Sequence, residues 1–523
     1  MTLRFASSSP LNPGRWWFAT DVFAFCSDFK KKETKETMTM EDTTPNHTKT
    51  SEGLGMLLRG NQLHIFPTGN NDRTIPSFFR DYHHDPNRRI HELTISCLHN
   101  NLTETMVDQI LDKRITAHLD KLSLRSLCVK PELFQRILLE TADTITHLEC
   151  SNLSQEIIKE SSSWMQIIGT MKLTTLTLSG NTFKQHEGTQ RLYSPWFGYN
   201  TTSSRLSKSL KELILNGSHF IYHYNDPYER EVLPNFIRTL VSLETISLKC
   251  CRLSHDATMA VIYALQTLTK LKKVDLGGNQ ACSWLNMGCI AYTLTIPASK
   301  HLTYLDLSYQ RNISMDRSKS LFKQLAESIS KPSCAVKVLR LAGNGIQDKH
   351  LHHLANVLAS PNTRLECLDL SNNHITANGL WHSLLRKLVT NQHLKYLNVK
   401  HNQISNLLIT DKDDQVLNDI LEELKTFNYS LQGLDHSCRM VAYGVTSKLN
   451  YIGHINQGGR RLLRTSKPLP LGLWPDILQH ASTSSCEYPS SHQDQPFVNA
   501  DAVFYFLRHG PLLHSLQESS SQY

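Results

Sequence analysis

VKVLRLAGNGI (Val336–Ile346), LECLDLSNNHI (Leu365–Ile375) and LKYLNVKHNQI (Leu394–Ile404) follow one pattern, and each begins 29 residues after the one before. All three are apolar at positions one, four and six, with Asn at position nine and Ile at position eleven. A pattern that recurs at a fixed period indicates stacked structural units, so the repeat decides how the rest of the chain is interpreted.

The spacing of the apolar residues predicts a strand followed by a helix in each unit. L-x-x-L-x-L places alternate side chains on one face, which is typical of a short strand with one buried side. The Asn after the strand can bond backbone groups of its own turn and of the neighbouring unit. Beyond it, residues 348–358 and 379–389 are apolar at helical spacing. Such a unit cannot bury its apolar side alone, so the units are expected to stack.

These units resemble leucine-rich repeats of the ribonuclease-inhibitor-like type. The resemblance implies an α/β solenoid shaped as a horseshoe, with parallel strands on the concave face and helices on the convex face. Weaker copies of the pattern extend the array to about twelve repeats. Their first positions are Ile90, Leu119, Ile145, Leu173, Leu210, Leu243, Leu271, Leu302, Val336, Leu365, Leu394 and Leu431. Further helices are expected at 257–268, 320–329 and 411–427.

The segments before the array differ from it in composition. Residues 1–50 are expected to be a disordered tail, with a transit peptide or a start at Met38 or Met40 as alternatives. Residues 51–89 contain three prolines and are expected to form an N-terminal cap over the apolar edge of the first repeat.

The array is assigned to residues 90–445, and residues 446–523 leave the repeat pattern. This C-terminal segment is expected to be a mainly helical module with a polar linker at about 480–498. Its motif order resembles a short module found after repeat domains in some algal proteins. Five basic residues without an intervening acid lie between Lys448 and Lys467. They are interpreted as the solvated face of a helix, with an anionic surface or RNA as the alternative contact.

Composition narrows the class of protein. The 523 residues carry a formal net charge of +8, dispersed along the chain, so nucleic acid is not an expected partner. No run of 18 apolar residues is present, so no membrane span is predicted. The 12 cysteines include no C-x-x-C and are interpreted as reduced thiols of an intracellular protein. A cytoplasmic monomer is expected, with the nucleus or an organelle as open alternatives.

No motif of a known catalytic or metal site was found in the sequence. A P-loop, a dinucleotide-binding glycine pattern, H-E-x-x-H, G-x-S-x-G and a paired-cysteine zinc motif are all missing. His350, His352 and His353 share a predicted helix, but a zinc site needs three or four donors and a supporting shell. We therefore predict no enzyme activity, no cofactor and no metal.

Two groups of residues are candidates for contact with a protein partner. Positions three and five face the concave side, and positions seven and eight lie at its edge. Tyr and Arg are frequent anchors of protein interfaces, although an Asp at position five can simply keep this face hydrated. The concave-face candidates are Asp275, Tyr304, Asp306, Arg340, Asp369, Tyr396 and Lys400.

The second group lies in two long, aromatic-rich insertions that follow Asn181 and Leu215. Both insertions come between a strand and its helix, so they are expected on the same rim, one repeat apart. Large rings are costly to leave in water, so these either pack on the array or contact a partner. The candidates are Tyr193, Trp196, Phe197, Tyr199, Tyr222, Tyr224 and Tyr228.

The function predicted from these features is a non-catalytic scaffold that binds a protein through the concave face and the aromatic rim. Two alternatives remain. In the first, the segment LPLGLWPDIL (residues 469–478) docks a ligase subunit, which would make the chain a substrate adaptor for ubiquitin ligation. In the second, the array regulates a small GTPase, with Arg340 as the exposed arginine that such an activity requires.

Overall fold

The computed structural model describes twelve stretches of the chain. They are residues 53–59, 61–68, 89–96, 104–184, 205–221, 227–279, 300–310, 315–404, 411–435, 443–464, 473–483 and 500–509. The chain divides into two units, residues 1–50 and 51–523, and all described residues lie in the second.

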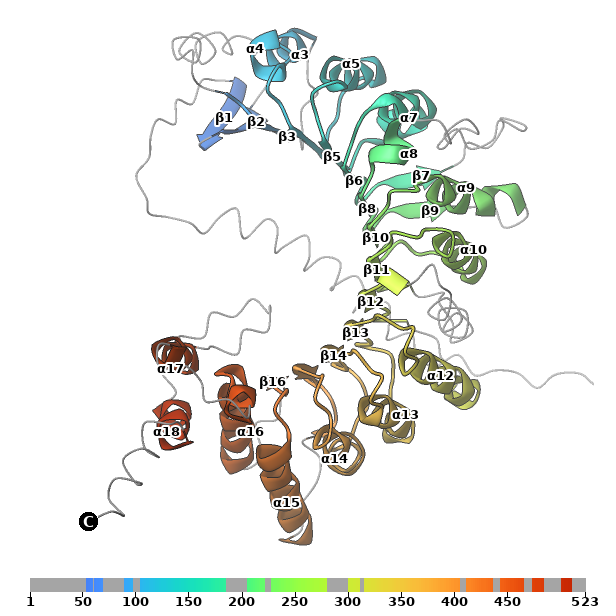
Figure 1. Cartoon of the computed structure of the whole chain (residues 1–523). Helices are drawn as coiled ribbons and strands as arrows, with labels where there is room; N and C mark the ends of the chain where they lie inside the picture. Colours follow the sequence, from blue (N-terminus) through green and yellow to red (C-terminus); the bar gives the residue numbers. More distant parts are fainter. Residues whose placement is uncertain are drawn as a thin grey trace, which may run out of the picture. The chain divides into compact units, whose positions relative to one another are not determined.

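One 14-stranded sheet runs through the second unit, and its strands follow one another in sequence order (Figure 1). It begins with an antiparallel hairpin of β1 (Gly53–Arg59) and β2 (Gln62–Thr68), and β2 pairs in parallel with β3. Every later pair is also parallel. The strands after the hairpin are β3 (Glu92–Ser96), β4 (Lys121–Arg125), β5 (His147–Ser151), β6 (Thr175–Thr177), β8 (Glu212–Ile214), β10 (Thr245–Ser247), β11 (Lys273–Asp275), β12 (Tyr304–Asp306), β13 (Val338–Arg340), β14 (Cys367–Asp369), β15 (Tyr396–Asn398) and β16 (Gly433–Asp435).

These strands confirm the predicted repeat solenoid. Without the hairpin, 14 − 2 leaves 12 strands, and each begins two residues after a first position expected from the sequence. The agreement includes the three weakest units, which start at Ile90, Leu119 and Ile145.

Helices follow the strands along the outer side of the sheet (Figure 1). The predicted helices at 257–268, 320–329, 348–358 and 411–427 are confirmed, with ends shifted by a few residues. The prediction at 379–389 is confirmed in part, because its first turns, Gly379–Leu385, are π-helical. The array helices are α3 (Glu104–Ile110), α4 (Lys113–Thr116), α5 (Pro131–Thr141), α6 (Gln155–Lys159), α7 (Ser161–Thr170), α8 (Arg205–Ser209), α9 (Pro227–Thr239), α10 (His255–Leu265), α12 (Met315–Ile329), α13 (Asp348–Ala359), α14 (Arg386–Leu388) and α15 (Asp411–Phe427).

The C-terminal segment is helical where it is described. It contains α16 (Tyr443–Gln457), a 3-10 turn at Arg460–Arg464, α17 (Trp474–Thr483) and α18 (Ala500–His509). Its own small core consists of Ile455, Trp474, Ile477 and Phe506.

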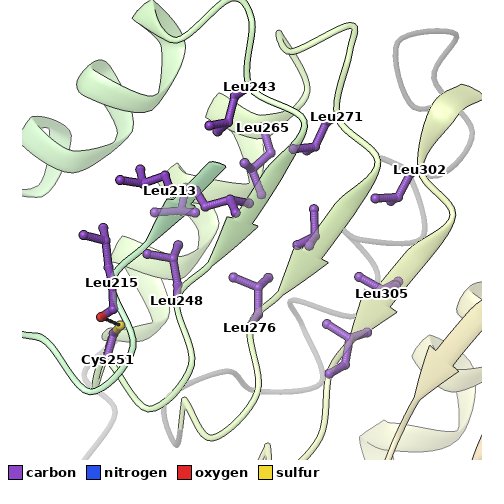
Figure 2. Close-up of a cluster of buried hydrophobic side chains, with 14 of the residues drawn as sticks. Leu213, Leu215, Leu243, Leu248, Cys251, Leu265, Leu271, Leu276, Leu302 and Leu305 are labelled. Carbon is purple, nitrogen blue, oxygen red and sulfur yellow. Dashed lines mark hydrogen bonds between the residues drawn. The ribbon is translucent and has the colours of Figure 1, made fainter. Parts of the chain in front are cut away.

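The apolar positions of the repeat fill one continuous core between strands and helices. Figure 2 shows this core around Leu213, Leu243 and Leu271, where leucines of successive units lie side by side. The leucines at positions one, four and six of the three clear units are almost completely buried. Because apolar burial supplies about 25 cal/mol per Å², the stacked leucines are the main stabilising contribution of each unit.

Where position nine is Asn, its side chain bonds the unit before it, as predicted. The Nδ2 of Asn373 donates to the carbonyl oxygens of Leu370 (2.8 Å) and Leu341 (3.1 Å), and its Oδ1 accepts from the amides of Asn344 and Ile346. Asn181, Asn279, Asn344 and Asn402 make equivalent bonds. These bonds satisfy backbone groups that the short strands leave unpaired.

Position eight adopts a left-handed backbone in each of the ten repeats where it is described. Its φ lies between 48° and 72° at Ser126, Asn152, Gly180, Gly217, Cys250, Gly278, Tyr309, Gly343, Asn372 and His401. This conformation lets the chain turn sharply from the strand toward the helix. Glycine adopts it freely, whereas other residues pay roughly 1 kcal/mol or more.

Candidate functional site

Position five of the repeat forms a polar row across the concave face. Asp275 lies beside Asp306 in the strand register, Asp306 beside Arg340, and Arg340 beside Asp369. Neighbouring strands are about 4.8 Å apart, so these side chains leave the sheet next to one another. The structure thus brings four of the predicted concave-face residues into one row.

Tyr304, at position three of the strand that carries Asp306, contacts side chains of both neighbouring strands. Its ring lies 4.8 Å from the Nζ of Lys273 and 5.6 Å from the guanidinium carbon of Arg340, both within the range of cation–π attraction. Its hydroxyl lies 3.5 Å from an oxygen of Asp306. We call Lys273, Asp275, Tyr304, Asp306 and Arg340 the Tyr304 cluster.

Backbone amides fix the two carboxylates of the cluster. One oxygen of Asp275 accepts from the amide of Gly277 at 3.0 Å, and one oxygen of Asp306 accepts from the amide of Ser308 at 2.9 Å. The second oxygen of Asp275 accepts only a longer bond from the Ser247 hydroxyl, at 3.3 Å. Within the described part of the chain, neither carboxylate makes an ion pair with Lys or Arg. Two fixed and closely spaced acids therefore lie in the cluster, of which Asp275 is half-buried and Asp306 is buried.

The surroundings of Asp275 and Tyr304 raise the pKa of both side chains. Burial raises the pKa of Asp275, and the neighbouring charge of Asp306 raises it further. Burial also raises the pKa of Tyr304, with a smaller contribution from Asp306. The cluster thus combines a phenol that stays protonated with an acid that holds its proton more tightly than usual. Nothing in it pairs a nucleophile with a base and an oxyanion site.

Acids at position two of the repeat form ion pairs with lysines, unlike Asp275 and Asp306 of the cluster. Glu366 lies 2.7 Å from the Nζ of both Lys337 and Lys395, and these lysines lower the pKa of Glu366. Glu244 lies 2.6 Å from the Nζ of Lys272. Exposed pairs of this kind contribute little stability, about 0–1 kcal/mol each, but they neutralise that row.

The remaining concave-face candidates do not join the Tyr304 cluster. Lys400 forms an ion pair with Asp435 at 3.3 Å, and the ring of Tyr396 lies against Gly433, so both belong to the last repeats. Asp369 accepts bonds from the amide and the hydroxyl of Ser371, at 3.0 and 2.7 Å.

Tyr309 lies at the edge of the concave face, and the sequence interpretation did not select it. It occupies the left-handed position eight, with φ of 57°, and its ring lies over Gly343 of the next repeat. Its hydroxyl accepts a bond from Asn372, two repeats further on, at 3.2 Å. A large aromatic residue at a position where four of the ten described repeats have glycine was the signal that could have identified it.

The aromatic insertions begin from a second, two-stranded parallel sheet. β7 (Thr182–Lys184) pairs with β9 (His219–Ile221), and the rings of Phe183 and Phe220 lie 5.5 Å apart. The two insertions therefore start side by side, one repeat apart. Tyr193, Trp196, Phe197, Tyr199, Tyr222 and Tyr224 lie outside the described residues, and of Tyr228 only the backbone, in α9, is described.

The histidines considered for a metal site have other contacts. His350 is buried, and its Nδ1 accepts from the amide of Gln347 at 3.1 Å, where it helps to cap α13. The rings of His352 and His353 lie 3.6 Å apart. Among the described residues, no group of three or more His, Cys, Asp or Glu side chains is arranged to hold a metal ion.

Comparisons with known proteins agree with the repeat architecture. The leucine-rich repeat family model matches residues 362–380 and 390–407, so the chain carries leucine-rich repeats. No curated protein matches the chain. No helix in the described part combines the length and apolar character that a membrane crossing requires.

Three of the solved structures similar to this chain have 13–18% sequence identity to it. The actin-binding site 2 of leiomodin-1 covers 33% of this chain and 91% of its own, with 18% identity and a TM-score of 0.27. The tropomodulin C-terminal domain of Caenorhabditis elegans covers 35% and 99%, with 18% identity and a TM-score of 0.27. Rad7, in its yeast complex with Elc1, covers 68% and 72%, with 13% identity and a TM-score of 0.36.

Proposed function

We propose that this chain is a non-catalytic scaffold that binds a protein partner through its concave face and its aromatic rim insertions. Leucine-rich repeat domains generally mediate protein–protein interaction. The observation that carries the proposal here is the Tyr304 cluster, in which an aromatic ring lies between two cations on one face of the sheet, beside the half-buried Asp275 and the buried Asp306.

The geometry of the cluster suits an interface anchor. Tyr304 is half-buried and held between Lys273 and Arg340, so little side-chain entropy is lost when a partner covers it. Tyr and Arg are the residue types most often found at the energetic centre of interfaces. Asp275, which is half-buried, adds a contact for a Lys or Arg of the partner, which gives orientation as well as attraction, whereas Asp306 is buried.

We assign the aromatic insertions to the same partner contact. Their strands β7 and β9 pair in parallel, so the two insertions begin at neighbouring points of the array. The residues assigned to the contact are Tyr193, Trp196, Phe197, Tyr199, Tyr222, Tyr224 and Tyr228. Hydrogen exchange with and without the partner tests this assignment. Slower exchange in residues 185–204 and 222–228 on binding is the expected result, and unchanged exchange there would remove the insertions from the proposal.

The concave-face contact is tested by partner capture with matched variants. Tyr304→Ala combined with Arg340→Ala should weaken binding by about 100-fold, since two anchors of an interface are lost. Tyr263→Ala is the control, because Tyr263 is an exposed tyrosine on the outer helix α10. Equal losses in both variants, or none in either, would place the contact elsewhere. The remaining candidates Asp369, Tyr396 and Lys400 can be screened in the same assay.

We also assign the array to the ribonuclease-inhibitor-like type, supported by the 29-residue spacing of the clear units and by a full helix in most of them. A monomer is supported by α16, which packs beside β16, the last strand of the sheet. The resemblance of the C-terminal segment to an algal module stays a proposal without a function attached.

The two alternative functions receive less support from the residues on which they depend. Trp474, in the segment expected to dock a ligase subunit, is only 3% exposed and belongs to the core of the C-terminal segment. Arg340, required for a GTPase regulator, is half-buried over Tyr304. A GTP turnover assay with Arg340→Ala addresses the second alternative directly.

A further inference from the structure

Helix α16 joins the array to the C-terminal segment through two separate cores. Leu449 and Ile452, on one part of the helix, are buried in the continuous core of the repeats. Ile455, one turn later, is buried with Trp474, Ile477 and Phe506 in the small core of the segment. A single rigid helix thus contributes to both cores, so neither can separate without exposing apolar surface.

The backbone of α16 lies directly against the last repeat. A side chain on Gly453 would overlap the carbonyl of Gln432, so the helix approaches the residue before β16 as closely as glycine allows. Asn456 donates from Nδ2 to the carbonyl oxygen of Leu431 at 2.8 Å. Leu431 is the first position of the last repeat, so α16 bonds that repeat directly.

Arg460 is the most unusual residue of this junction. It is 2% exposed, and its guanidinium donates to the carbonyl oxygens of Lys425 and Asn428. Both carbonyls lie at the C-terminal end of α15, where the last turn has no intrahelical donors and the helix dipole is negative. The guanidinium also lies 4.4 Å from the ring centre of Tyr429. The expectation that this basic stretch is a solvated helix face is therefore wrong at Arg460, although Arg461 is exposed.

Arg460 reaches the far end of the segment as well. Its guanidinium lies near Tyr505 of α18 and counteracts the rise that burial causes in the pKa of Tyr505. The ring of Tyr505 packs edge-on against Tyr451 and Phe506 at 6.3 and 5.6 Å. One guanidinium therefore contacts the end of α15, the turn before β16 and the last described helix of the chain. Burying a charge without satisfying it is costly, so this arrangement is stable only while all three parts are in place.

We propose that α16, the turn at Arg460, α17 and α18 form the C-terminal cap of the array, fold together with its last repeat as one cooperative unit, and are latched to it by Arg460. The cap replaces the next repeat: α16 covers the apolar end of the stack, and Arg460 supplies the donors that the end of α15 lacks. This inference is independent of the partner-binding proposal, because none of these residues lies in the Tyr304 cluster or the aromatic insertions.

The latch is tested on the full chain by hydrogen exchange of Arg460→Met beside Arg461→Met. Both variants remove one positive charge from the same turn, but only the first removes a buried contact. For Arg460→Met we expect exchange on the order of 100-fold faster in α15, β16 and α16 together, with β3 to β10 unchanged. Arg460→Lys should also fail to restore protection, because an ammonium cannot bond two carbonyls and stack on a ring in the same way.

Two results would overturn the proposal. Faster exchange in α16 to α18 with unchanged exchange in α15 and β16 would show an independent module, and an equal effect of Arg461→Met would show a general charge effect. If Arg460→Met fails to fold, exchange of the wild-type chain in increasing urea decides instead. The amides of α15, β16 and α16 should then open in one transition, and separate transitions would contradict a shared folding unit.

Discussion

At the scale of single residues, Asp275 is an acid whose ionised form is disfavoured by its surroundings. It lies beside Asp306 in the sheet, and burial together with that neighbour raises the pKa of Asp275. The folded chain therefore binds this proton more tightly than the unfolded chain does. The stabilisation from Asp275 is fully present below its unfolded pKa, about 3.9, and is lost as the pH rises through the higher folded value.

Replacing Asp275 with Asn should consequently stabilise the fold at neutral pH. The amide oxygen of Asn can still accept from Gly277, while the charge is removed. We expect the free energy of unfolding to rise by up to about 1 kcal/mol at neutral pH, with the gain shrinking as the pH approaches about 4. Urea denaturation over this pH range measures it. Asp369→Asn is the control, since Arg340 lies beside Asp369 in the sheet, and an equal gain there would contradict the electrostatic explanation.

Gly343 provides a second prediction at this scale. A Cβ at this position would overlap the ring of Tyr309, and the backbone is left-handed, with φ of 66°. Gly343→Ala should therefore cost about 2–4 kcal/mol, and Tyr309→Gly in the same chain should recover about half of that. Gly217→Ala is the matched control, because its backbone is also left-handed but no atom lies closer than 3.9 Å. A cost of only about 1 kcal/mol is expected there, and thermal denaturation compares the variants.

The sequence predicted which residues face the concave side, but it could not predict which of them touch. Asp275, Tyr304, Asp306 and Arg340 come together because the register of β11, β12 and β13 aligns their positions. Lys400 pairs instead with Asp435, which no pattern in the sequence singled out. Contacts of this kind depend on side-chain rotamers across strands, and the repeat pattern carries no information on them.

At the scale of elements, the asparagine at position nine holds neighbouring units together. Asn373 makes bonds to two backbone amides and three carbonyl oxygens, all from groups that would otherwise be buried and unsatisfied. In other repeats, different residues at position nine make part of these bonds. The hydroxyl of Ser218 donates to the carbonyl oxygen of Leu178, and the side-chain amide of Gln310 donates to the carbonyl oxygen of Leu276.

Asn373→Ala should therefore destabilise the array locally and strongly. The expected loss is about 2–4 kcal/mol, because several buried backbone groups lose their partner at once. Hydrogen exchange should show faster opening around residues 341–375 and little change before β11. Asn362→Ala is the control, since that asparagine is exposed, and its effect should stay within about 0.5 kcal/mol. An effect of Asn373→Ala no larger than the control would show that the bonds contribute nothing net.

Strand positions could be predicted from the sequence more accurately than helix geometry. All twelve strands begin where the leucine pattern places them, because burial on one face fixes their register. The π-helical stretch Gly379–Leu385 was not predicted. It lies where a side chain on Gly379 would overlap Asp348, and Asp348 bonds the amide and hydroxyl of Thr376. Such a close approach between two units does not recur at the repeat period, so the repeat pattern cannot predict it.

At the scale of the whole molecule, the end strands of the sheet have one edge that no further described strand pairs with. β16 is paired on one side only, by β15, and α16 packs beside it. A chain ending at residue 442 would lose this helix and expose a strand edge together with apolar core. We expect the full chain to be monomeric and the shortened chain to self-associate, as light scattering on both would show. A monomeric and stable shortened chain would contradict this account.

The C-terminal segment shows where sequence reasoning was least informative. Its helices were expected, but their role was not, because in the sequence nothing distinguishes Arg460 from the other Lys and Arg residues, of which the chain has 55 in total. Only its contacts with Lys425 and Asn428, 35 and 32 residues earlier, distinguish it from the exposed Arg461. Long-range contacts of a single side chain cannot be predicted from local pattern or composition.

The similar bonding of Asn344, Asn373 and Asn402 to the preceding unit has a consequence for how such a chain changes length. A second copy of residues 365–393, inserted after residue 393, would meet a clear repeat unit on each side, as the original does. Duplication or deletion of one 29-residue unit there would leave the hairpin at one end and the Arg460 junction at the other untouched. The middle of the array is thus the place where evolution or a designer can lengthen the concave surface, while the two ends stay fixed.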